Sequence, residues 1–343
     1  MRQTSLKILL AFLLLTYFSC SEETHIPPEW GKKEPEAGEK NEQIVKQGWT
    51  NLEKTFGELP SYIAVYKSPN SLQNKQAIAY IAVADMSKAT FDILGDIKYD
   101  DTAKGYGSKS VNTLTQFYNK AAKPIIINAG LFYYANSFYY SQNLVVKNSV
   151  MLSPNQNYYS KDWVTYWYPT LGAFSQMEDD SFKASWTYFT STGINYSYNK
   201  PAGNSANKLP LQVPDATFPE VATALKAKTA VGGVGVLLKN GEVVNTYVEE
   251  LLDVSSTSNQ PRTAIGITAE KKMILFVCEG RNVTSGVAGL TTLDVANVMK
   301  SLGCVDALNL DGGGSSGMLI NGKETIKPSG GSQRAVLTGI SLQ

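Results

Sequence analysis

The sequence predicts an α+β fold, a single large domain with a mixed, twisted β-sheet core and flanking helices. Segments 125–127 and 273–278 are continuously apolar, which is typical of strands buried on both faces. Segments with helical periodicity are few and do not alternate with strands as in a regular βαβ repeat. The length of 343 residues allows an ample core.

The N-terminus is predicted to be an export signal. Two basic residues precede the apolar run 8–15, which is too short for a comfortable membrane span and ends shortly before Ser19 and Cys20. This order predicts a signal peptide over residues 1–19 and a bacterial lipoprotein with Cys20 as its lipidated first residue. Tyr17 departs from the aliphatic residue usual three positions before the cysteine, so ordinary secretory cleavage is the alternative.

On either interpretation the mature chain is exported. Residues 20–40 are charged, contain proline and have few aliphatic side chains, so we expect a lipidated, flexible tether there. The expected location is the cell envelope, periplasmic or at the cell surface, with the membrane as a partner through Cys20. The folded domain is expected over residues 41–343.

Within this domain the first half mixes helical and strand signals. Helical periodicity covers 42–56 and 111–123, the second with Asn112 or Thr113 as its cap and Pro124 as its end. Strands are expected at 62–67, 76–85 and 125–132. Residues 133–200 are rich in Tyr and Trp among Ser, Asn and Gln, as in strands that pack in a sheet, and we expect one or two of these rings to line a substrate cleft.

The second half is more regular. A short helix is expected at 219–228, a hairpin at 231–242, and strands at 262–267, 273–281 and 305–308. A helix over 291–302 begins with a capping box formed by Thr291 and Asp294.

Composition excludes several functional classes. The net charge of +1 argues against a nucleic-acid partner bound through a basic surface. The single histidine, His25, lies in the polar N-terminal segment, which excludes Ser-His-Asp and Cys-His catalysis and ordinary His-ligated zinc. Cys278 and Cys304 are expected to be buried free thiols, and an exported location leaves a disulfide between them open.

Polar side chains lie at or next to the ends of four of the expected strands. They are Asn128, Arg262, Glu279 with Arg281, and Asn309 with Asp311, which three glycines follow. A charge at the end of a buried strand needs a partner, so an ion-pair network such as Arg281 with Asp311 is one explanation, and a tight glycine turn capped by Ser315 is another. Taken together, and without histidine, these residues favour an anionic substrate or a metal.

These segments appear in the order found in the phosphodiester glycosidase domain family, which the chain resembles over roughly residues 60–343. The segments are 128–132, 231–233, 262–266, 279–281, 290–296, 309–318 and 333–336. The resemblance is most specific over 262–343, where Asn-Leu-Asp-Gly-Gly-Gly-Ser is close to diagnostic, and the aromatic insertion 133–200 is not a family signature. The family's Asn-Gly-Gly-Phe-Phe is Asn-Ala-Gly-Leu-Phe in this chain, and its Asp-Gly-Arg is Glu279-Gly280-Arg281.

The resemblance implies a hydrolase that cleaves a sugar-1-phosphodiester, such as an N-acetylglucosamine-1-phosphodiester, at the glycosidic bond of a glycan or cell-surface polymer. Asp311 and Glu279 become the base or nucleophile, and Asn128 and Asn309 orient substrate or water. Phosphate contacts fall to Arg262, Arg281, Arg334, Gly312, Gly313, Gly314 and Ser315. No cofactor is certain, and a Ca²⁺ ion held by Asp311, Glu279 and Asn128 is a variant.

Two alternatives use the same residues. One is a surface glycan-binding lipoprotein without catalysis, and the aromatic segment would suit glycan binding. The other is a phosphodiesterase or a polysaccharide-assembly factor that acts through the same site.

Overall fold

The structure is a computed structural model that describes residues 42–203, 212–251 and 254–343. The predicted signal peptide, lipidated Cys20 and tether lie outside these described residues. Among the described helices, none has the length and apolar character needed to cross a membrane.

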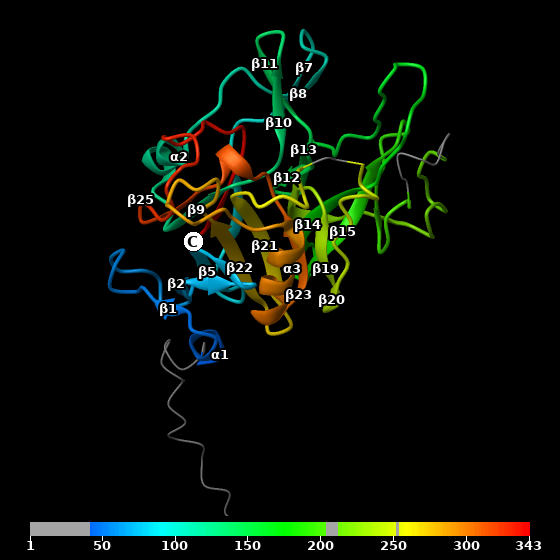
Figure 1. Ribbon diagram of the computed structural model, residues 1–343. Helices are drawn as coiled ribbons and strands as arrows, with labels where there is room; N and C mark the ends of the chain where they lie inside the picture. Colours follow the sequence, from blue (N-terminus) through cyan, green and yellow to red (C-terminus); the bar gives the residue numbers. More distant parts are fainter. Residues whose placement is uncertain (1–41, 204–211, 252–253) are drawn as a thin grey trace, which may run out of the picture. The chain divides into compact units, whose positions relative to one another are not determined.

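The described chain is predominantly β, so the predicted α+β class is wrong. It has three α-helices, α1 (Glu42–Lys46), α2 (Leu114–Ala121) and α3 (Thr292–Ser301), one 3₁₀ turn, η2 (Gly313–Ser315), and 26 strands (Figure 1). Every described strand pairing is antiparallel, so the sheet is not mixed either.

Two of the expected helices explain the error. The pattern at 42–56 yields only α1, because Gly48 adopts a left-handed φ of 87° and the chain turns into a strand. The segment 219–228 forms β17 (Thr223–Ala224) and the start of β18 (Ala227–Gly232), because Thr223 and Ala224 pair with the preceding strand. Tertiary pairing overrides a weak local preference in such short segments.

The largest sheet carries most of the predicted strands. Its order is β1 (Thr50–Asn51), β2 (Ile63–Lys67), β5 (Ala79–Asp85), β22 (Lys272–Cys278), β21 (Arg262–Thr268), β23 (Cys304–Asn309), β19 (Val236–Lys239) and β20 (Glu242–Val243). Helix α3 covers one face of this sheet, over β21, β23, β19 and β20 (Figure 1). Its predicted capping box is confirmed, with Thr291 accepting from Asp294 N–H and the Asp294 carboxylate accepting from Thr291 N–H.

Four further sheets complete the described chain. The seven-stranded sheet runs β13 (Val150–Ser153), β12 (Val145–Lys147), β18, β14 (Leu171–Met177), β15 (Phe182–Phe189), β16 (Asn195–Tyr198) and β17. The five-stranded sheet runs β25 (Lys323–Glu324), β24 (Met318–Ile320), β9 (Ile125–Asn128), β26 (Gly339–Leu342) and β6 (Phe91–Leu94). The four-stranded sheet runs β10 (Phe132–Ala135), β11 (Phe138–Ser141), β8 (Gly105–Ser108) and β7 (Lys98–Asp100), and β3 (Ser71–Leu72) pairs with β4 (Lys75–Gln76).

The core divides between the two faces of the largest sheet. Alternation along β21 places Ile265 in the cluster shared with the five- and seven-stranded sheets, and Ala264 in the cluster beneath α3. Cys278 and Cys304 lie in this second cluster as free, buried thiols, as expected. Burial raises the pKa of Cys278 to about 12, so it stays a neutral thiol at physiological pH.

Three strand ends meet at one point. Leu310 N–H, just past β23, donates to the Thr263 carbonyl of β21, and Asp311 N–H donates to the Ala129 carbonyl just past β9. The two distances are both 2.9 Å. The largest sheet and the five-stranded sheet therefore deliver their ends to the glycine-rich segment that begins at Asp311.

Candidate active site

Asp311 is the centre of the candidate site. It follows β23, lies partly open to solvent, and accepts hydrogen bonds from the Ser315 hydroxyl and the Gly312 N–H. Burial raises its pKa to about 6, and these two bonds and the charge of Arg334 offset only part of that effect. A carboxyl group with this pKa is mostly ionised at pH 7 and can still exchange a proton near neutrality, which suits a general base.

Two arginines lie over the glycines that follow Asp311. If Gly313 carried a Cβ, that atom would lie 2.8 Å from Nη2 of Arg281. A Cβ on Gly314 would lie 2.5 Å from Nη2 of Arg334. The two glycines therefore leave room for two guanidinium groups beside the carboxylate.

Both guanidinium groups keep donors for a ligand. Both arginines are exposed. Arg281 donates through Nε to Gln260 Oε1 at 2.8 Å, and Arg334 donates through Nη1 to Ser315 Oγ at 3.5 Å. Within the described ranges these are the only acceptors of the two side chains, so most of their N–H groups are free to bind oxygen atoms of an anion.

Arg262, expected to contact phosphate, passes beside Gly312 and uses its guanidinium donors on the protein backbone. The side chain is only 2% exposed and points to the α3 face of the sheet. It donates four hydrogen bonds, all to backbone carbonyls, which belong to Val254, Ser255, Ser258 and Leu290. Burial lowers its pKa to about 10, and the side chain serves to fix the loop before β21.

Asn128 is also a positioning residue and does not face a substrate. Its Nδ2 donates to the Asp311 carbonyl at 2.6 Å. Its Oδ1 accepts from the Thr263 hydroxyl at 2.8 Å and from Gly317 N–H at 3.2 Å. This fully buried amide therefore holds both ends of the 311–317 loop.

Glu279 and Asn309, both expected in the site, are buried side chains. Glu279 is 3% exposed and accepts from Lys327 N–H at 2.9 Å, and its second carboxylate oxygen is shielded from solvent without a described partner. Asn309 donates from Nδ2 to the carbonyls of Val234 and Leu310. The structure thus brings Asp311, Arg281, Arg334, Ser315 and the glycines together, with Asn309 bonded within the protein and one oxygen of Glu279 unbonded.

The glycine loop is not an open row of N–H donors. The N–H groups of Gly313, Ser315 and Ser316 donate to backbone carbonyls, and that of Gly312 donates to Asp311. Among the described residues only the Gly314 N–H of this loop has no acceptor. The loop backbone therefore offers one free donor, and the other free N–H groups at this site belong to Arg281 and Arg334.

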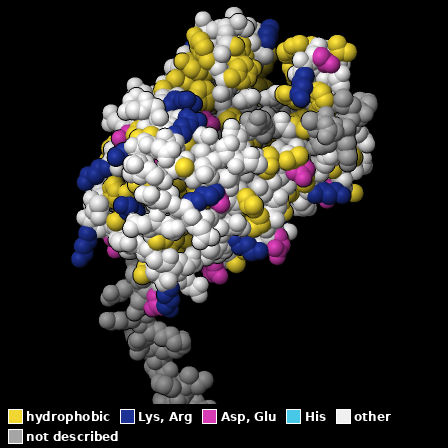
Figure 2. Space-filling view, in the orientation of Figure 1, with side chains coloured by type: hydrophobic (Ala, Val, Ile, Leu, Met, Phe, Trp, Pro, Cys, Tyr) yellow, Lys and Arg dark blue, Asp and Glu magenta, His cyan; other side chains and the backbone are white. Residues whose placement is uncertain are grey.

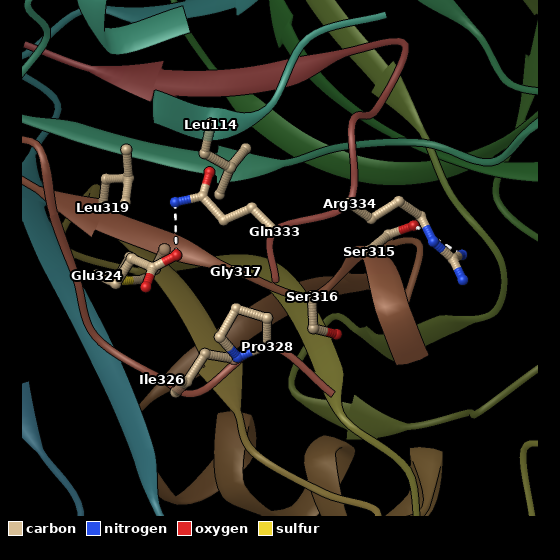
Figure 3. Close-up of a pocket in the computed structure, with 11 residues that line it drawn as sticks. Leu114, Ser315, Ser316, Gly317, Leu319, Glu324, Ile326, Pro328, Gln333 and Arg334 are labelled. Carbon is tan, nitrogen blue, oxygen red and sulfur yellow. Dashed lines mark hydrogen bonds between the residues drawn. The ribbon is translucent and has the colours of Figure 1, made fainter. Parts of the chain in front are cut away.

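A small pocket lies behind the loop. Figure 3 shows Ser316, Pro328, Ile326 and Leu114 around it, with Gln333 donating to Glu324 at 2.6 Å on one side. Arg334 lies on the other side, pointing toward Ser315 and away from this pocket (Figure 3). Gln333 also bonds Thr115 of α2, so the pocket wall anchors the segment that carries Arg334.

The residues expected for a metal do not fit one. Asn128 Oδ1 already accepts two hydrogen bonds, and Glu279 is held by Lys327 N–H. No group of three or more His, Cys, Asp or Glu side chains in the described part of the chain is arranged to hold an ion. Calcium prefers six to eight oxygen ligands, which this set does not supply.

Two supporting residues were not predicted from the sequence. Thr263 bonds Asn128, and Gln260 bonds Arg281. Thr263 could have been found by alternation, because it faces the opposite side of β21 from Arg262. Gln260 lies in a loop before β21 and carries no sequence signal that we can identify.

Comparisons with known proteins find matches to parts of this chain. The family model described as phosphodiester glycosidase matches residues 123–343. An SPbeta prophage-derived uncharacterized protein of Bacillus subtilis (strain 168) is 35% identical over 82 residues, which is 24% of this chain and 12% of that protein. The N-acetylglucosamine-1-phosphodiester alpha-N-acetylglucosaminidase of Mus musculus is 31% identical over 110 residues, 28% of this chain and 20% of that protein. The matches thus span a fifth or less of these relatives.

Solved structures share the fold. The catalytic domain of the zebrafish N-acetylglucosamine-1-phosphodiester alpha-N-acetylglucosaminidase, auto-inhibited by its pro-peptide, aligns with a TM-score of 0.53 at 17% identity over 81% of this chain and 82% of that one. A hypothetical protein from Synechocystis gives 0.52 at 16% over 82% and 62%. A protein of Burkholderia pseudomallei K96243 assigned as exported gives 0.54 at 14% over 78% and 74%. At these identities the likeness shows the fold alone.

Proposed function

Because this chain belongs to the phosphodiester glycosidase family, we propose that it hydrolyses a sugar-1-phosphodiester at the glycosidic bond. The products would be a free sugar and a phosphomonoester. One observation supports this proposal best. A carboxylate with a pKa of about 6 lies beside two exposed arginines whose N–H groups are largely unused.

Substrate binding is assigned to the arginines. A phosphodiester carries one negative charge and two non-bridging oxygens, and guanidinium groups bind such oxygens bidentately. Arg281 and Arg334 lie over consecutive glycines and so would hold one phosphate between them. Ser315 and the N–H of Gly314 would add neutral donors at the same place.

The chemical step is assigned to Asp311. The carboxylate takes a proton from a water molecule whose oxygen attacks the anomeric carbon, and the bond from that carbon to the phosphate oxygen breaks. The electron pair of the broken bond leaves with the phosphomonoester, which the arginines stabilise as its charge grows. A phosphate is already a weak base, so a strong general acid is not needed at the leaving oxygen.

Export and membrane anchoring belong to the same proposal. The N-terminal sequence carries the signal and Cys20 described above, and one structural neighbour is assigned as exported. An exported hydrolase of this kind would act on a glycan or cell-surface polymer. Metabolic labelling with a radioactive fatty acid tests the anchor, and Cys20→Ala should abolish the label.

The test of the activity uses a synthetic N-acetylglucosamine-1-phosphate alkyl diester and the purified protein. We expect release of N-acetylglucosamine and the alkyl phosphate, and a loss of at least about 10³-fold in kcat for Asp311→Asn. Asp179→Asn, in an exposed turn, is the matched control and should keep full activity. Equal turnover by Asp311→Asn and the parent protein would remove Asp311 from the mechanism.

A further inference from the structure

An open groove of about 610 Å³ lies away from the arginines and is lined by aromatic rings. Its walls come from four separate stretches, near β8, on the β10–β11 hairpin, over 153–163 and at the end of β15. The aromatic rings that line it are those of Tyr106, Tyr133, Tyr140, Tyr158, Tyr159, Trp163 and Phe189. Pockets of this size commonly accept small organic ligands.

The β10–β11 hairpin divides its tyrosines between two faces. Tyr133 pairs across the strands with Tyr140, and Tyr134 pairs with Tyr139. The rings of Tyr133 and Tyr140 stack in parallel, with centroids 4.9 Å apart, and both line the groove. Tyr133 is still 48% exposed, so the stacked pair forms a platform with an open ring face.

A second exposed ring lines the groove from the stretch 153–163. Trp163 is 73% exposed and has a left-handed φ of 59°, which is uncommon for a bulky residue. Its backbone is fixed by Ser160 Oγ, and the Asp162 carboxylate accepts from the N–H groups of Val164 and Thr165. The loop therefore adopts an unfavourable backbone conformation that leaves an indole ring exposed, and a purely structural loop does not require this.

The polar part of the lining is mostly uncharged. Gln142, Gln156 and Asn157 supply amide groups, and the lining residues of this groove include no Asp or Glu and one cation, Lys104. Aromatic faces suit the apolar C–H faces of sugar rings, and amides suit their hydroxyl groups. An acidic or basic polymer would find little charge to pair with here.

The groove is joined to the catalytic site by a short stretch of chain. Gln142 N–H donates to the Leu131 carbonyl at 3.0 Å, and Ala129, two residues earlier, accepts from Asp311 N–H. Figure 1 places the β10–β11 hairpin directly beyond this stretch. In Figure 2 the same region carries a gathering of hydrophobic side chains, with basic side chains beside its foot.

We propose that this groove binds neutral sugar rings of the glycan that carries the scissile phosphodiester. The proposal rests on the proposed function for the identity of the substrate, and it adds a binding site for the polymer beyond the reacting sugar. Stacking on Tyr133 and Trp163, which line the groove from separate stretches of chain, would hold the glycan while its phosphodiester end reaches Arg281 and Arg334.

The test is binding to an array of neutral and acidic oligosaccharides, followed by titration of the best ligand in an isothermal calorimeter. We expect saturable binding of neutral oligosaccharides, weakened at least about tenfold by Trp163→Ala and by Tyr133→Ala. Tyr134→Ala is the matched control, because Tyr134 is the next residue on the same strand, is 60% exposed and faces away from the groove. Binding of acidic glycans alone, no glycan binding, or equal binding by all three variants would overturn the proposal.

Activity is read separately so that the two proposals fail independently. Asp311→Asn should abolish hydrolysis of the small alkyl diester and leave oligosaccharide binding unchanged. Trp163→Ala should leave kcat/KM for that small diester unchanged and raise KM several-fold for a polymeric phosphodiester. If the small diester is not cleaved but the groove binds glycans as expected, the proposed reaction fails and the groove stands.

Discussion

Replacing Asp311 with Asn should stabilise the protein at neutral pH. The folded structure raises the pKa of this carboxyl from its ordinary value of 3.8 to about 6, so above pH 6 folding keeps a charge where burial disfavours it. At about 1.36 kcal/mol for each unit of pKa, the full shift corresponds to about 3 kcal/mol. Because Asp311 is partly open to solvent, we expect a gain of about 1 to 3 kcal/mol for Asp311→Asn.

The sign of the pH dependence makes this prediction specific. Between pH 3.8 and about 6 the folded protein binds more protons at Asp311 than the unfolded chain does, so the parent protein loses stability as pH rises through this window. The advantage of Asp311→Asn should therefore be fully present at pH 7.5 and fall to about a third of that value at pH 4.5. Urea unfolding at the two pH values, followed by far-UV circular dichroism, measures both quantities.

Asp162, a carboxylate whose pKa is lowered and not raised in the folded protein, supplies the control. Hydrogen bonds from the backbone N–H groups of Thr165 and Val164 lower the pKa of Asp162 to about 2, so Asp162→Asn should give no gain in stability at pH 7.5. Equal stability of Asp311→Asn and the parent protein at pH 7.5, or a gain that does not shrink on acidification, would refute the buried, strained charge on which the catalytic assignment depends.

Three further outcomes are expected. Gly314→Ala should raise KM for the phosphodiester several-fold with little change in the urea midpoint, because its new methyl group displaces only the flexible end of Arg334 and the backbone at Gly314 is not left-handed. In a pH–rate profile, the kcat/KM of the parent protein should fall about tenfold per pH unit below about pH 6, because protonated Asp311 cannot act as a base. A flat profile down to pH 5 would contradict this role. Arg262→Met should cost about 3 kcal/mol or more in urea unfolding, because four backbone carbonyls lose the donors of a buried side chain. The folded fraction should keep the parent KM, whereas a raised KM without destabilisation would support Arg262 as a phosphate ligand.

Local signals in the sequence predicted many of the elements but not the fold class. Helix α3 was predicted closely because a capping box and a Gly303 end bracket it, β22 because its apolar run is continuous, and β21 and β23 because their short segments are largely apolar. The dominance of antiparallel sheet could not be read in the same way, because the partners of short strands such as β9, which are β24 and β26, are distant in the chain.

The site shows the same division between local and distant information. Asp311 and its glycines form one segment, so their proximity follows from the sequence, and Arg281 and Arg334 joined them through the resemblance to the family. Alternation correctly placed Arg262 on the face of Ala264, but the sequence does not say that this face lies beneath α3. Asn128 bonds Asp311 and Gly317, which lie about 185 residues further along the chain. One sequence cannot reveal contacts between residues so far apart.

Cleavage of the synthetic diester in ¹⁸O-labelled water tests the central claim most directly. Attack of water at the anomeric carbon places the label in the released N-acetylglucosamine and none in the alkyl phosphate, as mass spectrometry of the two products would show. Label in the phosphate would mean that the P–O bond breaks instead, and the site around Asp311, Arg281 and Arg334 would then belong to a phosphodiesterase.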